Sequence, residues 1–201
     1  METASLKRKK KNIYVCSNES YPACTVHCKP DSAHLQEFIL LVEGIIRKLR
    51  MKQASYDKLN VSGERSQAVQ KLISSDVSGF ISYGRRFSLI PESEIGSLFD
   101  GLPIGPKPDG LFRIKKQGQK STRGVMVEVE RGQSIQNNAD LKDIWKCHIC
   151  KHTEYLILFV PIELCQARKR ERVYARVVNR LAPFFSEGMT INVEAVAIIG
   201  Y

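Results

Sequence analysis

Three acidic residues lie at the ends of two apolar segments in the middle of the chain. Asp109 precedes residues 110–114, and Glu128 and Glu130 close residues 124–130. Because side chains alternate along a strand, Glu128 and Glu130 project from the same face. Neighbouring like charges repel, so we expect a cation beside them. Mg²⁺ is commonly bound by one or two carboxylates; the alternative is a solvent-exposed face on which Lys and Arg pair with the acids.

Apolar periodicity and turn residues predict the elements that position these acids. In chain order they are a helix from Asp31 or Ser32 to about Lys52, a helix from about Ser62 to Ser75, strands at 79–82 and 87–90, a loop at 96–108, the two acidic strands, a helix capped by Asn137 or Asn138, a strand at 155–160, a basic helix at about 166–181 and a strand at 190–199. This order implies an α/β domain with a mixed central sheet flanked by helices.

The first predicted helix carries one charge in its most apolar stretch. Its inward residues recur at three- and four-residue steps: Leu35, Phe38, Ile39, Val42, Ile45, Ile46 and Leu49. Within residues 38–46 the only charge is Glu43. This carboxylate is either at the edge of the buried stripe, where it reaches water, or held in place for a function.

The composition favours one domain that binds a polyanion. With 201 residues and 43% hydrophobic content, the chain is expected to form a single domain at 31–201 preceded by a basic arm and a Cys-containing lead-in at 1–30. The core of this domain spans about 31–162, and its C-terminal helix and strand span 163–201. Lys and Arg number 31 against 21 Asp and Glu, giving a net charge of +10. Nucleic-acid binders share this balance with ribosomal, membrane-surface and other basic proteins.

The start of the chain runs into charge at 7–11, and no apolar run is long enough to span a membrane. We therefore expect a cytoplasmic protein, or a nuclear one in a eukaryote, with its six Cys reduced. The basic run is either a mobile arm that contacts phosphates or a solubilising tail. Two groups raise the alternatives of a zinc site and of ordinary buried thiols: Cys16, Cys24, His27 and Cys28, and Cys147, His148, Cys150 and His152.

The acidic segments resemble the PD-(D/E)XK nuclease superfamily over about residues 31–162. Pro108-Asp109 is similar to the first half of its motif, and Glu128-Val129-Glu130 to the second half, with Glu130 where Lys is usual. A Glu-x-Glu form occurs among restriction endonucleases of the BamHI type. The resemblance implies a restriction endonuclease-like core in the order helix, three strands, helix, strand (αβββαβ).

Phosphodiester hydrolysis by a bound divalent metal suits these acids, with Asp109 and Glu128 as the metal ligands. By resemblance, Glu130 orients or deprotonates the attacking water. The missing Lys is replaced by Lys142 or Lys146 on the following helix, unless these are surface or phosphate-contacting residues, and Glu43 supplies a further acid.

Several cations flank the proposed centre and are expected to contact DNA phosphates. They are Lys107, Arg131, Lys146, Arg85, Arg86 and Lys116. The expected function is that of a Mg²⁺-dependent endodeoxyribonuclease on double-stranded DNA, most simply a type II restriction enzyme acting as a homodimer. The alternatives are a nuclease-fold module that binds DNA without cleaving it, and a nuclease of repair, transposition or RNA processing.

Overall fold

The fold is taken from a computed structural model, which describes residues 6–16, 21–32, 35–59, 68–73, 75, 87–89, 109–114, 124–130, 137–150, 152–166 and 169–201. The elements in chain order are β1 (Leu6–Lys10), β2 (Ile13–Cys16), β3 (Ala23–Cys28), α1 (Leu35–Met51), α2 (Gln53–Leu59), β4 (Phe87–Leu89), β5 (Gly110–Ile114), β6 (Gly124–Val129), α5 (Ala139–Ile149), β7 (Thr153–Val160), β8 (Leu164–Gln166), β9 (Lys169–Glu171), α6 (Val173–Leu181), the 3₁₀ helix η2 (Ala182–Phe185) and β10 (Ala195–Gly200).

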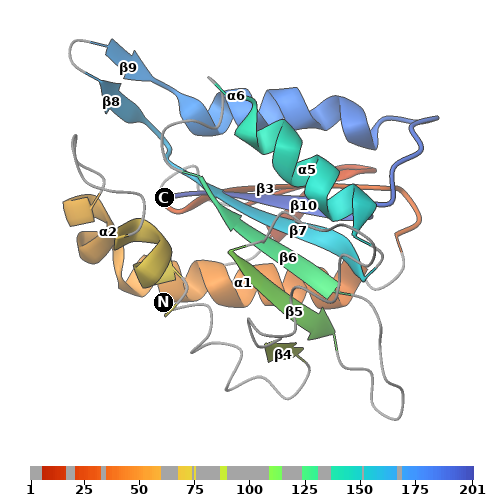
Figure 1. The fold of residues 1–201 in the computed structure, drawn as a ribbon, viewed down its shortest axis with the longest axis horizontal. Coiled ribbons are helices and arrows are strands. Elements are labelled where there is room, and N and C mark those ends of the chain that lie inside the picture. The colour runs from red at the N-terminus through yellow and green to blue at the C-terminus, as the bar shows by residue number, and fades with distance from the viewer. Residues whose placement is uncertain are drawn as a thin grey trace, which may run out of the picture.

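Eight strands form one mixed sheet in the order β1-β2-β3-β10-β7-β6-β5-β4 (Figure 1). β6 and β10 run parallel to β7, whereas the pairs β1–β2, β2–β3, β3–β10, β5–β6 and β4–β5 are antiparallel. Helix α5 connects the parallel neighbours β6 and β7. The predicted α/β class with a mixed sheet and helices around it is therefore confirmed.

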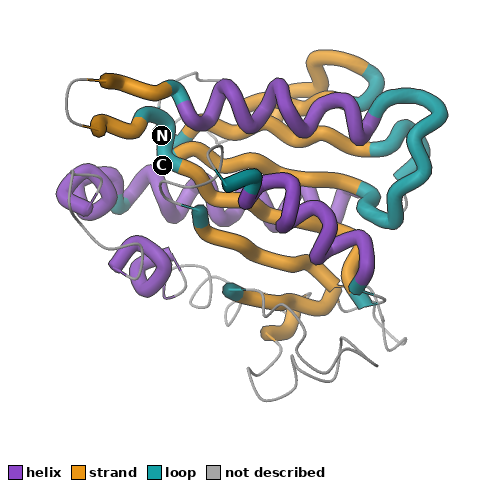
Figure 2. The backbone as a smooth tube through the Cα atoms, turned by 45° about the horizontal axis from the view of Figure 1, so that its top comes forward, coloured by secondary structure: helices purple, strands orange, loops and turns teal. Residues whose placement is uncertain are grey.

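The two faces of the sheet are covered by different helices (Figure 2). On one face, α1 packs against Val125, Val127 and Val129 of β6. On the other face, Met126 of the same strand packs in a cluster with residues of α5 and α6. Odd and even residues of β6 thus face different layers, as strand alternation requires.

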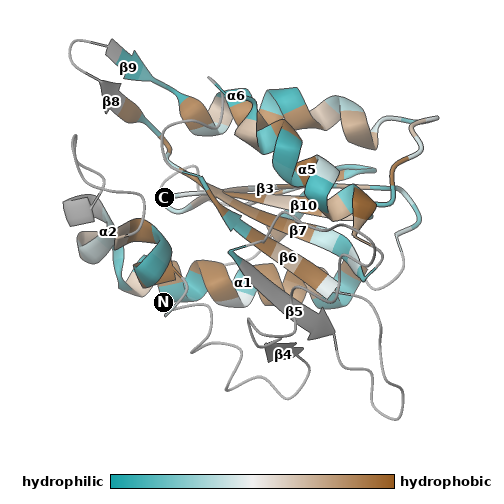
Figure 3. Ribbon diagram, viewed as in Figure 1, coloured by the Kyte–Doolittle hydropathy of each residue, from teal (hydrophilic) through white to brown (hydrophobic). Residues whose placement is uncertain are grey.

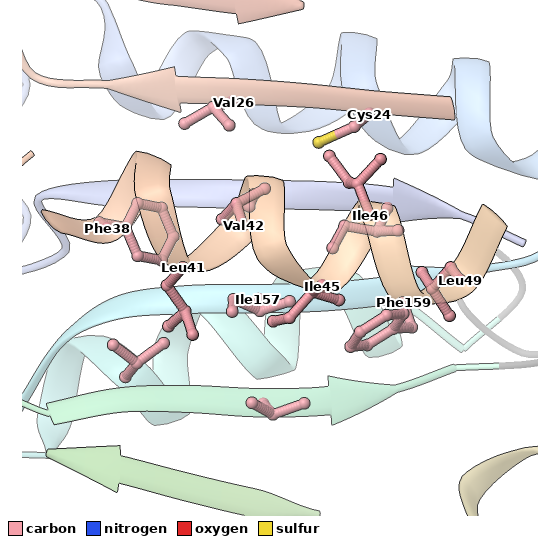
Figure 4. Packing of buried hydrophobic residues seen from close by; sticks show 14 of the residues in the cluster. Cys24, Val26, Phe38, Leu41, Val42, Ile45, Ile46, Leu49, Ile157 and Phe159 are labelled. Atoms are coloured by element: carbon pink, nitrogen blue, oxygen red, sulfur yellow. The ribbon is translucent and has the colours of Figure 1, made fainter. Parts of the chain in front are cut away.

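Helix α1 supplies one wall of the core. Its residues Phe38, Leu41, Ile45 and Leu49 are buried, and they lie between the helix and the sheet, where β7 carries Ile157 and Phe159 (Figure 4). The predicted first helix and its inward pattern are confirmed, with Leu35 only partly buried. In Figure 3 the central strands are hydrophobic, as expected for a sheet covered on both faces.

The described parts of two further predicted elements agree with the prediction. Residues 68–73 are helical, and Val69 and Ile73 are buried. Strand β7 is buried along nearly its whole length. The predicted strand at 79–82 and the loop at 96–108 lie outside the described residues. In the described part of the chain, no helix is long and apolar enough to cross a membrane.

The structure corrects the prediction of a mobile basic arm. Residues 6–10 form strand β1, which pairs with β2, and β3 pairs with β10 along its whole length. Leu6 is buried in the core, while the basic residues that follow it are exposed at the edge of the sheet. An edge strand lets these cations remain in water while the backbone pairs, so charge alone did not exclude a strand.

Two boundaries near the C-terminus also differ from the prediction. The basic helix begins at Val173, because residues 164–171 form the β8–β9 hairpin. The last strand begins at Ala195.

Candidate functional site

The fold brings Asp109 to the end of the strand that carries the two glutamates. Asp109 precedes β5, which is antiparallel to β6 and places Gly110 opposite Val127. The Asp109 carboxylate accepts a hydrogen bond from the Val129 backbone N–H, with 2.8 Å between Oδ2 and N. Asp109 and Glu128 therefore lie near each other, as predicted, at the end of the sheet where β6 finishes and β5 begins.

Glu128 and Glu130 differ in exposure. Glu128 is buried, with 3% of the residue exposed, and strand alternation places it on the Met126 face beside α5. Glu130 is half-buried, and its backbone is held on both sides. Its N–H donates to the Phe159 carbonyl at 2.8 Å, and its own carbonyl accepts from the Tyr201 hydroxyl at 3.1 Å. The end of β6 is thus fixed by β7 and by the last residue of the sequence.

Helix α5 contributes two further acids and one Lys to this edge. Asp143 and Lys146 are three residues apart, and Asp143 is buried. The Lys146 Nζ lies 2.9 Å from Glu128 Oε1 and 2.8 Å from Asp143 Oδ1. Among the described residues, the buried Asp143 Oδ2 has no hydrogen-bond partner. Asp140, one turn earlier, is fully buried, and its Oδ1 lies 3.7 Å from Arg180 Nη1 of α6.

We name Asp109, Glu128, Glu130 and Asp143 the acid cluster. Burial, reinforced by the charge of Asp143, raises the pKa of Glu128 to about 8, against the opposing effect of Lys146. Burial and the same aspartate raise the pKa of Glu130 to about 7. The pKa of Asp143 is also raised, chiefly by burial.

Lys146 is the cation that the acid cluster contacts directly. Burial alone would lower the pKa of Lys146, but Glu128 and Asp143 outweigh this effect and raise it above its ordinary value. One ammonium group is shared between two buried carboxylates, so it cannot neutralise both. At neutral pH the raised pKa values of Glu128 and Glu130 therefore favour proton uptake by the acid cluster.

No ready-made metal site is present in the described part of the chain, where no three His, Cys, Asp or Glu side chains are grouped to hold an ion. Lys146 stands between two of the acids. The assignment of Asp109 and Glu128 as metal ligands therefore remains a prediction.

The structure does not bring Glu43 to the acid cluster. Glu43 lies on α1, which covers the sheet face opposite to α5, and its Oε1 accepts a hydrogen bond from the Leu6 backbone N–H at 2.8 Å. It connects the first helix to the first strand. This contact accounts for an acidic residue inside the apolar stretch of α1.

The structure separates the two helix lysines, both of which were candidates to replace the motif Lys. Lys142 is exposed on α5, whereas Lys146, also a candidate phosphate contact, is bonded to the acids. The remaining predicted DNA contacts lie outside the described residues: Lys107, Arg131, Arg85, Arg86 and Lys116.

Sequence reasoning missed Asp140 and Asp143. Both lie in phase with Ile144 and Cys147, the buried residues of α5. Acids at three-residue spacing inside an apolar helical stripe are the signal that could have identified them, because buried carboxylates require a partner.

The Cys and His residues that raised a zinc alternative have separate contacts. Cys24, Cys28, Cys147 and Cys150 are buried and form no disulfide. His27 Nε2 lies 3.0 Å from the Val178 carbonyl oxygen. His148 Nδ1 accepts a hydrogen bond from the Asn192 backbone N–H.

The chain was also compared with known proteins. No family model, curated protein or solved structure matches it.

Proposed function

We propose that the chain is a Mg²⁺-dependent nuclease that hydrolyses phosphodiester bonds in double-stranded DNA. One observation carries this proposal: Lys146 contacts both Glu128 and Asp143, and the charges of Asp143 and Asp109 act on Glu128 and Glu130 at the end of β6. The elements α1, β4, β5, β6, α5 and β7 follow one another in the order of the PD-(D/E)XK core that the sequence resembles, with α2 and the helical residues 68–73 between α1 and β4, and this order supports the proposal.

The acid cluster fits a divalent cation on three grounds. It contains four carboxylates and contacts one ammonium group. The pKa values of Glu128 and Glu130 are raised, which means that added positive charge would be favourable. Asp143 also keeps a buried oxygen without a hydrogen-bond partner among the described residues. Asp109 and Glu128 would hold the ion, with Asp143 close by.

A bound divalent ion would neutralise phosphate charge and lower the pKa of a bound water. The protein's own groups have distinct tasks. The Glu130 carboxyl has a pKa of about 7, close to that of an efficient general base at neutral pH, so it can accept the proton of the attacking water. The Lys146 ammonium group keeps its proton and can stabilise negative charge that develops on the phosphate.

A plasmid assay tests the proposal. Purified protein is incubated with supercoiled DNA and Mg²⁺, with and without chelator, beside Asp109→Asn, Glu128→Gln and the control Glu187→Gln, whose residue is exposed in the turn after η2. We expect cleavage only with metal, a loss of at least about 100-fold in both cluster variants and no loss in the control. Discrete fragments would indicate a restriction enzyme and a smear an unspecific nuclease. Cleavage by Glu128→Gln at the wild-type rate would contradict the proposed site.

A DNA-binding module without catalysis is the second candidate. The observation that favours it is the pair of close contacts from Lys146 to Glu128 and Asp143, which supplies the buried acids with a protein cation. For such a module, the same assay would give retarded plasmid and no cleavage at any metal concentration.

A further inference from the structure

Strand β1 presents a row of cations at one edge of the sheet. Its sequence is Leu-Lys-Arg-Lys-Lys, and only Leu6 is buried. Lys11, in the turn that follows, is exposed as well. We name Lys7, Arg8, Lys9, Lys10 and Lys11 the β1 basic edge. β1 is the outermost strand, so no further strand covers it in the described sheet.

The β1 basic edge is held in place by the fold. β1 pairs with β2, and the Leu6 N–H donates to Glu43 at 2.8 Å. The Arg8 guanidinium donates to the Lys11 carbonyl at 2.8 Å and lies 6.0 Å from the centre of the Tyr14 ring. Cations fixed on a strand lose less conformational entropy on binding than those of a flexible tail.

The β1 basic edge also lacks acidic partners. Within the described residues, none of its five side chains forms an ion pair. Other cations are paired: Lys29 with Glu194, and Arg176 with Glu171. The positive charge of this edge is therefore available to a polyanion.

The β1 basic edge is well separated from the acid cluster. Five strand-to-strand steps lead from β6 to β1 through β7, β10, β3 and β2. At about 4.8 Å per step this is about 24 Å, the length of about seven base pairs. Leu6 faces the α1 side of the sheet. By alternation, Lys7 projects from the other side, where Glu128 and α5 lie. A duplex of more than about seven base pairs is long enough to reach both places.

We propose that the β1 basic edge binds backbone phosphates of the nucleic acid as a second contact, remote from the acid cluster. The identification of the polyanion as DNA rests on the proposed function. Lys residues on an edge strand also prevent pairing with other chains. A positive or a negative charge would serve that protective role equally well. Phosphate binding, in contrast, requires positive charge.

The salt dependence of binding separates the two roles. Affinity for a duplex of about 30 base pairs is measured by fluorescence anisotropy in chelator, so that no cleavage occurs, at several salt concentrations. Each phosphate contact contributes about 0.9 to the slope of log K against log salt concentration. For Lys7→Gln/Lys9→Gln we therefore expect a slope smaller by about 1.8 and weaker binding, and for Lys7→Glu/Lys9→Glu a larger loss.

The matched control is Arg170→Gln/Arg176→Gln, which removes the same charge from cations already paired with Glu163 and Glu171. Its slope should equal that of the wild type. A wild-type slope in both β1 variants, or an equal reduction in the control, would overturn the proposal. Circular dichroism checks that the variants fold. Cleavage is scored separately, so a protein that binds through β1 without cleaving would refute only the proposed nuclease activity.

Discussion

Lys146 shares one positive charge between Glu128 and Asp143, both of which are buried. Removing this Lys leaves two carboxylates without their cation in a site of low polarity. Loss of one partner from a buried ion pair costs about 3 kcal/mol or more. We therefore predict that Lys146→Met lowers the free energy of unfolding by about 3 kcal/mol in urea denaturation followed by circular dichroism.

The matched control for this change is Lys142→Met, which removes an exposed Lys from the same helix and should change stability by at most about 0.5 kcal/mol. Combining Lys146→Met with Glu128→Gln and Asp143→Asn should recover part of the loss, because the unpaired charges are gone. If Lys146→Met and Lys142→Met were equally stable, the ion pairs of Lys146 with Glu128 and Asp143 would not contribute to the stability of the fold.

The raised pKa of Glu130 predicts a pH dependence of stability. The carboxyl titrates near 4.5 in the unfolded chain and near 7 in the folded protein. Between these values the folded form holds a proton that the unfolded form has lost, so this group's contribution to stability falls as pH rises and levels off above 7. Denaturation of wild type and Glu130→Gln from pH 5 to 8 measures the difference. A difference that increases in favour of the wild type over that window would have the wrong sign.

The placement of Asp109, Glu128 and Glu130 at the ends of two strands could be predicted, because strand alternation and chain order are local properties of the sequence. The choice between Lys142 and Lys146 was not, because it depends on the phase of α5 relative to the sheet. Trp145 and Ile149 of α5 are about half-exposed and mark its outer side. With that phase known, Lys146 is the lysine that faces the acids.

At the scale of elements, the start of α5 depends on an unusual backbone conformation. Asn138, the N-cap, has a φ of 54° in the left-handed region, and its side-chain oxygen accepts a hydrogen bond from Arg180 of α6. Asn tolerates this conformation better than other non-glycine residues. The pair positions α5, and with it Asp143 and Lys146.

We predict that Asn138→Ala destabilises the protein by about 1–2 kcal/mol, since Ala is strained at positive φ and loses the contact with Arg180. Asn138→Gly loses the same contact without the strain, so it should be about 1 kcal/mol more stable than the Ala variant. Thermal denaturation of the wild type and both variants would rank their stabilities. A Gly variant no more stable than the Ala variant would argue against strain from the left-handed backbone at this position.

Strand β10 packs closely where Gly200 lies between β3 and β7. A Cβ at this position would be 2.8 Å from Ile162 Cγ1 and 3.0 Å from Tyr174 Cδ2. We predict that Gly200→Ala destabilises by about 1–3 kcal/mol through overpacking. The same change in an Ile162→Ala background should cost less, because the nearest atom is absent. Equal costs in both backgrounds in urea denaturation would contradict the close approach.

Two elements that the sequence did not predict, β3 and β1, depend on partners outside the strand itself. Strand β3 pairs with β10, far along the chain, and β1 joins the sheet only through β2. Local composition at 7–11 is that of a solvated tail, so no local signal distinguished a strand from an arm. Periodic helices such as α1 were predicted because their pattern is contained within the element.

At the scale of the whole molecule, the acid cluster and the β1 basic edge lie far apart on the sheet. The carboxyl end of β6, the start of β5 and one side of α5 meet at the acid cluster, whereas the cations of β1 lie at the far edge. In α/β sheets, ligands commonly bind at the carboxyl ends of parallel strands. The position of the acid cluster follows this rule, and of its four acids only Asp143 was not identified from the sequence.

Binding of Mn²⁺, a substitute for Mg²⁺, tests most directly whether the acid cluster holds a divalent cation. The signal of free Mn²⁺ in electron paramagnetic resonance is followed at neutral pH for the wild type, Asp109→Asn/Glu128→Gln and the exposed control Glu187→Gln. We predict that the wild type and the control bind Mn²⁺ that Mg²⁺ displaces, with proton release because Glu128 and Glu130 have pKa values of about 8 and about 7. The double variant should not bind. Unchanged binding by the double variant, or no binding by the wild type, would contradict a metal site in the acid cluster.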